Sequence, residues 1–157
     1  MVKFRIVFFV LAFALGFGRF ITSANAESMA RDSKIASTTC SKEEIANGTS
    51  HISKQLNAFR LNNIQKAYTY ASKDFKSSKN LKQFEELIKT GYPMLIGSKN
   101  FQIVSCDKIS QLFMFVLNLS DKSQQLWEMR YLISYRGGAW GVEAATITQA
   151  SNTKINS

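Results

Sequence analysis

The hydrophobic pattern of this chain changes at its single proline, Pro93. Before Pro93, apolar residues recur three or four positions apart, as they do along one face of an α-helix. After it, apolar and polar residues alternate, and this period of two is typical of β-strands with one buried face. The pattern therefore predicts a helical first part and a sheet-forming second part, which together make an α+β fold.

The helical part contains three amphipathic stretches. We expect the first to start at Thr49 or Ser50, because Asn47-Gly48 continues a helix poorly. Ser41 and Glu44 have the spacing of a capping box, which predicts at most a short helix before that point. The apolar positions of the three stretches are Ile52, Leu56 and Phe59, then Ile64, Ala67, Tyr68 and Ala71, and finally Leu81, Phe84, Leu87 and Ile88.

The sheet-forming part predicts four antiparallel strands, at 101–104, 109–120, 127–135 and from Trp140 onward. Gly137-Gly138 predicts a tight hairpin between the last two, because both glycines accept a positive φ. The expected architecture has N-terminal helices packed on a curved four-stranded antiparallel sheet.

The first 26 residues have the pattern of a secretory signal peptide. Lys3 and Arg5 form a basic head, residues 6–18 carry no charge, and Ala24-Asn25-Ala26 is a small-residue cleavage site. The alternative is an uncleaved membrane anchor, but a helical span needs about 20 apolar residues, and Arg19 interrupts the run earlier. We predict cleavage after Ala26 and export to the periplasm or the exterior, with the leader as the only part that contacts a membrane.

Removal of this leader sets the expected domain organisation. The chain divides into a signal peptide (1–26), a flexible lead-in (27–48), a single α+β domain (49–149) and a flexible tail (150–157). The remaining 131 residues are enough to build one hydrophobic core. The formal charge falls from +9 to +6, because the leader holds three basic and no acidic residues.

Two cysteines, Cys40 and Cys106, remain after the leader. In an oxidising compartment an even pair indicates one disulfide, while the alternative is two free thiols, with Cys106 buried in a strand. Two cysteines and a single histidine are too few for a structural zinc site with four Cys or His ligands. We therefore predict no metal and no cofactor.

Signals for catalysis are sparse in this sequence. The chain has no metalloprotease, phosphate-binding-loop, dinucleotide-binding or nucleophile-elbow motif. We interpret His51 as a solvated residue near a helix start, and Asp107 and Asp121 as turn residues. An aspartate or tyrosine acting as acid or base in a pocket remains the alternative.

Lysines are concentrated in the helical part, close to several tyrosines and phenylalanines. Such interleaving occurs in nucleic-acid and anionic-lipid binders. Within this part, however, the lysines are spread out along the sequence rather than adjacent, and arginine is scarce. We interpret them as a solvated surface and expect no nucleic-acid partner. The lysines in question are Lys66, Lys73, Lys76, Lys79, Lys82 and Lys89.

Five short motifs between residues 52 and 147 resemble, in order, a bacterial family known as domain of unknown function 4864. They are Gln55-Leu56-Asn57-Ala58-Phe59-Arg60, Ala67-Tyr68-Thr69-Tyr70-Ala71-Ser72, Gly91-Tyr92-Pro93, Trp127-Glu128-Met129-Arg130-Tyr131 and Gly138-Ala139-Trp140. The resemblance implies a cone-shaped, nuclear transport factor 2-like (cystatin-like) fold, in which helices pack into a bent antiparallel sheet with a pocket between them. The family brings no activity with it.

We therefore expect an exported, non-catalytic domain that binds a small molecule or a protein partner. One version of this role is that of a secreted effector. The candidate pocket lining is aromatic and consists of Tyr92, Trp127, Tyr131 and Trp140. The alternative for each of these residues is plain hydrophobic core. The alternative function is an isomerase or hydratase that uses an aspartate or tyrosine in the pocket. The oligomeric state is left open.

Overall fold

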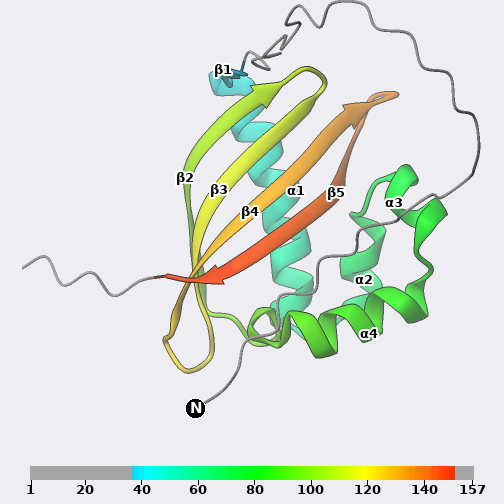
Figure 1. Ribbon diagram of the computed structural model, residues 1–157, viewed down its shortest axis with the longest axis vertical. Coiled ribbons are helices and arrows are strands. Elements are labelled where there is room, and N and C mark those ends of the chain that lie inside the picture. Colours follow the sequence, from blue (N-terminus) through cyan, green and yellow to red (C-terminus); the bar gives the residue numbers. More distant parts are fainter. Residues whose placement is uncertain (1–36, 151–157) are drawn as a thin grey trace, which may run out of the picture. The chain divides into compact units, whose positions relative to one another are not determined.

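A computed structural model describes residues 37–150 (Figure 1). The predicted signal peptide, its cleavage site at Ala26, the first part of the lead-in and nearly all of the tail lie outside the described residues. In chain order the elements are β1 (Ser37–Thr39), α1 (Lys42–Arg60), α2 (Ile64–Thr69), α3 (Lys73–Ser78), α4 (Leu81–Gly91), a 3-10 helix (Pro93–Leu95), β2 (Asn100–Ile109), β3 (Leu112–Ser120), β4 (Leu126–Arg136) and β5 (Ala139–Gln149).

The α+β class is confirmed, but the sheet has five strands rather than four. All neighbouring strands are antiparallel, and their order in the open sheet is β1-β2-β3-β4-β5. The additional strand is β1, which pairs with the end of β2 so that Thr39 lies opposite Asp107. Its three polar residues carry no hydrophobic alternation, so the pattern of the sequence could not predict it.

Helix α1 also begins earlier than expected, at Lys42 instead of Thr49 or Ser50. The capping box is present: the Ser41 hydroxyl accepts from the Glu44 amide at 3.2 Å, and the Glu44 carboxylate accepts from the Ser41 amide at 2.8 Å. The helix then runs through Gly48, which is buried. A Cβ atom at Gly48 would lie 2.7 Å from Cε2 of the Phe115 ring, and closer still to Cζ. Tertiary contact therefore overrides the low helix propensity of glycine.

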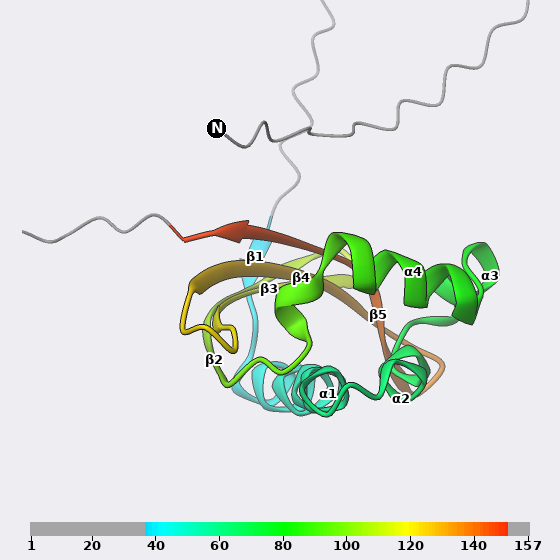
Figure 2. The same ribbon diagram turned by 90° about the horizontal axis from the view of Figure 1, so that it is seen from below.

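The helices cover the concave face of the curved sheet (Figure 2). Register shifts at 103/105 in β2 and at 132/133 in β4 mark irregularities of the kind that bend a sheet. Within residues 37–150 there are four α-helices instead of the three expected. The additional one is the short helix α3, whose first turn is capped by the Ser72 hydroxyl. None of the helices within residues 37–150 is both long and apolar enough to cross a membrane.

The core lies between α1 and the sheet. The largest fully buried side chains come from α1, from the 3-10 helix and from the two central strands. They are Ile52, Phe59, Leu95, Phe115, Leu117, Leu119, Met129, Tyr131 and Ile133.

Candidate functional site

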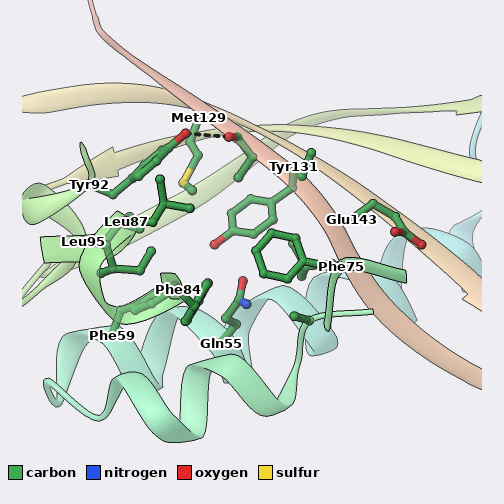
Figure 3. Close-up of a pocket in the computed structure, with 15 residues that line it drawn as sticks. Gln55, Phe59, Phe75, Phe84, Leu87, Tyr92, Leu95, Met129, Tyr131 and Glu143 are labelled. Atoms are coloured by element: carbon green, nitrogen blue, oxygen red, sulfur yellow. Dashed lines mark hydrogen bonds between the residues drawn. The ribbon is translucent and has the colours of Figure 1, made fainter. Parts of the chain in front are cut away.

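A cavity of about 180 Å³ lies between helices α1 and α4 and strands β4 and β5 (Figure 3). Its walls are mostly apolar, and they bring together residues far apart in the sequence. The residues that line it are Gln55, Phe59, Ala71, Phe75, Phe84, Leu87, Ile88, Tyr92, Leu95, Met129, Tyr131, Val142, Glu143, Ala144 and Ala145. Phe75, Leu87 and Tyr92 are only partly buried, so these three lining residues also border solvent.

Helix α4 forms one wall, and local sequence signals define both of its ends. At its start, Asn80 and Gln83 form a capping box. At its end, Tyr92 is the C-cap residue, and Pro93 opens the following 3-10 helix. The Tyr92 hydroxyl donates to the carbonyl oxygen of Ala145 at 2.9 Å, which ties the end of α4 to strand β5.

Tyr131 on strand β4 contributes a polar atom to this apolar site. Its side chain is 1% exposed, and its hydroxyl has no hydrogen-bond partner among residues 37–150. Figure 3 shows that hydroxyl pointing into the cavity. Burial raises the pKa of the phenol well above its usual range, and the nearby Tyr92 raises it further. At neutral pH, Tyr131 is therefore a neutral hydroxyl that can donate or accept.

Gln55 on helix α1 is a second polar side chain at the cavity. It is 2% exposed, and its Nε2 donates to the carbonyl oxygen of Ala67 at 3.1 Å. In Figure 3 its amide is directed from α1 toward the cavity and lies below the rings of Tyr131 and Phe75. Gln55 lies on the face of α1 that also carries Ile52 and Phe59, so a polar residue in an apolar stripe was the signal that sequence reasoning missed.

Aromatic rings form the part of the wall around helix α4. Phe84 is at the centre of this group, with ring centroids 6.0 Å from Phe59, 5.3 Å from Tyr68 and 5.7 Å from Phe75. Aromatic pairs at such separations stabilise each other beyond their burial. This side of the cavity is therefore a packed wall.

Glu143 is the only acidic residue in the lining, and its carboxylate is already engaged. One oxygen accepts from the Ser72 hydroxyl and the other from the Ser134 hydroxyl, both at 2.6 Å. Figure 3 shows the carboxylate turned away from the cavity. The lining, as described, therefore offers no free carboxylate as a general base.

The four aromatic residues predicted as pocket lining do not come together. Tyr92 and Tyr131 line the cavity, but Trp127 and Trp140 lie outside it. Trp127 donates its Nε1–H to the Asp121 carboxylate at 2.9 Å. Trp140 packs against Phe113 and Tyr135, with ring centroids 4.9 and 5.1 Å away. The two tryptophans therefore leave this cavity open.

Asp121 is a structural turn residue, as its position in the sequence indicated, but the same prediction is wrong for Asp107, which lies within strand β2 between its partners Thr39 and Met114. Its carboxylate accepts from the backbone amides of Ser123 and Gln125, and from the Ser123 hydroxyl. Burial opposes ionisation of Asp121, but the hydrogen bonds from Ser123, Trp127 and Gln125 outweigh it and lower the pKa of the carboxyl.

The expectation that His51 is solvated is wrong. It lies within α1, half-buried, with its ring edge-on to Tyr70 and its Nε2 2.9 Å from the Tyr70 carbonyl oxygen. A carbonyl oxygen only accepts, so this nitrogen carries the proton and donates. Burial, opposed by this hydrogen bond, lowers the pKa of His51.

Cys40 and Cys106 form a disulfide, with Cα atoms 5.6 Å apart and both residues buried. The bond joins the start of α1 to strand β2, and the Cys40 amide also donates to the Cys106 carbonyl at 3.2 Å. Within residues 37–150, no group of three or more His, Cys, Asp or Glu residues could hold a metal ion.

Two of the lysines named above contact the aromatic residues beside them. Lys66 lies over the Tyr70 ring at 5.6 Å, and Lys76 over the Tyr68 ring at 5.8 Å. The Tyr68 hydroxyl donates to the Lys79 carbonyl at 2.8 Å. These tyrosine rings are covered by local contacts.

Comparison with known proteins identifies the family. No curated protein matches the chain. The family described as Domain of unknown function (DUF4864) matches residues 41–155, which include helix α1, every lining residue of the cavity and strand β5. This match spans well over half of the chain and agrees with the five motifs found in the sequence, so the protein belongs to the DUF4864 family.

Proposed function

We propose that this protein is an exported, non-catalytic domain that binds a small and largely apolar molecule in the cavity between α1, α4 and the sheet. The observation that carries the proposal is the cavity itself. Protein interiors are close-packed, with few voids larger than a water molecule. The cavity between α1, α4 and the sheet measures about 180 Å³ and has mostly apolar walls. For comparison, a cavity of about 150 Å³ with apolar walls is known to hold benzene. A molecule of one ring or a short chain fits it.

Export is supported by two independent features. The first 26 residues have the pattern of a signal peptide, and Cys40 and Cys106 form a buried disulfide. Disulfides persist mainly in the periplasm and outside the cell. The arrangement of helices on a bent antiparallel sheet also supports the nuclear transport factor 2-like fold, in which the pocket lies between these layers.

A binding role is favoured over the isomerase or hydratase alternative by the chemistry of the lining. Acid–base catalysis needs a group that exchanges a proton near the working pH. The oxygens of Glu143 are engaged by Ser72 and Ser134. The raised pKa of Tyr131 keeps its proton in place at neutral pH. The cavity can therefore enclose a molecule but lacks a proton acceptor suited to such a reaction.

Titration of the protein, expressed from its full sequence, with toluene tests this function. Leu87 lines the cavity from helix α4 and is only partly buried, so Leu87→Trp should fill part of the cavity with the larger side chain. The matched control is Leu61→Trp, because Leu61 is 73% exposed and lies outside the cavity lining. We expect the original protein and the control to bind toluene alike, and Leu87→Trp to bind at least tenfold more weakly. Absence of toluene binding, or equal binding by all three proteins, would overturn the proposal.

A further inference from the structure

We propose that the hydroxyl of Tyr131 recognises one uncharged hydrogen-bonding group on the bound molecule, so that the cavity selects small neutral alcohols, phenols or ketones over hydrocarbons and ions. This inference rests on the proposed function and specifies its ligand class. It follows from what Tyr131, Tyr92, Gln55 and Glu143 each do with their polar atoms.

The hydroxyl of Tyr131 is a buried polar atom without a partner among the described residues. A buried polar group left without a hydrogen bond costs about 1–3 kcal/mol, and most such groups in native proteins are paired. A phenylalanine at position 131 would fill the same space without that cost. A bound molecule with one hydrogen-bonding group would satisfy this oxygen.

Tyr92 provides a contrast within the same cavity. Its hydroxyl is committed to the Ala145 carbonyl at 2.9 Å, so it fastens α4 to β5 and is not free for a ligand. The other buried unpartnered hydroxyl, that of Thr49, belongs to a residue outside this lining. Among these three hydroxyls, Tyr131 alone is both unpartnered and directed into the cavity.

The position of the Tyr131 hydroxyl restricts the number of polar groups a ligand can have. Around it in Figure 3 lie the apolar side chains of Leu87, Leu95 and Phe84. The side-chain amide of Gln55, which lies below the Tyr131 ring in that view, is a second polar group on this side of the cavity. A ligand with one polar head therefore finds hydrogen bonds at this spot and apolar contact elsewhere. A second polar group would be buried against carbon atoms, which is unfavourable.

Charged ligands are disfavoured by the same surroundings. The lining contains no lysine, arginine or histidine that could pair with an anion. Its one carboxylate, on Glu143, points away and is bonded to two serines. Burial also raises the pKa of both Tyr92 and Tyr131, which shows that this environment opposes charge.

Three probes of similar size test the inference: toluene, benzyl alcohol and benzoate. In the original protein we expect benzyl alcohol to bind about threefold or more tighter than toluene, and benzoate to bind at least tenfold more weakly than either. Tyr131→Phe should weaken benzyl alcohol binding roughly three- to tenfold, which corresponds to one net hydrogen bond. The same variant should bind toluene within twofold of the original protein, and this also shows that its cavity is intact.

Tyr135→Phe is the matched control, because it removes a tyrosine hydroxyl from the same strand at a residue that is 51% exposed and lies outside the cavity lining. We expect it to leave the ratio of benzyl alcohol to toluene affinity unchanged. If Tyr131→Phe also leaves that ratio unchanged, or if benzoate binds as well as benzyl alcohol, this inference is overturned while binding in the cavity stands. If toluene does not bind the original protein at all, the proposed function fails and this inference fails with it.

Discussion

The two halves of helix α1 face the same sheet in different ways. In the N-terminal half, Gly48 lies directly against the Phe115 ring, next to a stretch of chain fixed by the Cys40–Cys106 disulfide. In the C-terminal half, Gln55 and Phe59 face the cavity. We call these the close-packed region and the cavity region.

The difference shows that the cavity is a local feature and not a sign of a loose core. In the close-packed region the helix approaches so closely that only a hydrogen atom fits at position 48. In the cavity region the same helix carries large side chains, yet space remains beside Tyr131 and Gln55. Polar atoms thus lie where packing is incomplete, which is the arrangement of a binding site with few polar groups in an apolar pocket.

The largest expected effect comes from the disulfide of the close-packed region. Its cysteines are 66 residues apart, and closing a loop of that length stabilises a protein by about 4 kcal/mol in the chain-entropy model. We expect Cys40→Ala with Cys106→Ala to lower the free energy of unfolding in urea by about that amount. Toluene affinity of the folded variant should stay within twofold. Loss of toluene binding in the folded variant would show that the two regions are coupled, and would contradict the conclusion that the cavity is a local feature.

A single added methyl group should distinguish the two regions next. Gly48→Ala places a Cβ against the Phe115 ring, where overpacking costs about 1–3 kcal/mol. Alanine favours a helix over glycine by about 1 kcal/mol, so a net loss in urea unfolding would mean that the steric contact dominates. We expect that net loss.

Two variants serve as controls for Gly48→Ala. Gly91→Ala adds the same group at the end of α4, where the nearest atom, Leu87 Cδ1, is 3.8 Å away, and we expect it to be neutral or slightly stabilising. Val142→Ile adds one methylene to a lining residue of the cavity region, and we expect a change within about 1 kcal/mol. If Val142→Ile cost as much as Gly48→Ala, the two regions would be equally packed.

Local signals predicted much of the fold. The helical spacing of Leu81, Phe84, Leu87 and Ile88 predicted α4, and the change of pattern at Pro93 predicted where it ends. Gly137-Gly138 predicted the β4–β5 hairpin, and both glycines have positive φ, 58° and 77°. These features depend on a few neighbouring residues, so they can be recognised without knowing the tertiary structure.

The elements that sequence reasoning missed depend on distant contacts. Helix α1 continues through Gly48 because Phe115 packs against it. Trp127 was predicted as pocket lining together with Tyr131, and the two side chains do share one face of β4, because they are four residues apart in a strand. Alternation does not tell where along the strand the helices leave space, and Trp127 lies near the β3–β4 turn, bonded to Asp121. The face was predictable, but the position of the cavity was not.

The smallest expected effect concerns the pH dependence of the cavity region. The Tyr70 carbonyl accepts from His51 Nε2 and from the Val142 amide, so His51 supports the attachment of the α2 end to a cavity strand. Burial lowers the pKa of His51 below 6.5, so below that pH the unfolded chain binds more protons than the folded one. The contribution of the neutral His51 side chain to the free energy of unfolding should therefore be complete above pH 6.5. It should be lost as the pH falls from there through the lower pKa of the folded state. His51 is the sole histidine. The carboxyls with a lowered pKa, Glu44 and Asp121, take up protons only at more acidic pH, so they do not contribute to a decrease in this range. In urea unfolding between pH 7.5 and 5, the free energy of unfolding should thus decrease less in His51→Gln than in the original protein. If it decreases equally in both proteins, the pH dependence does not come from His51.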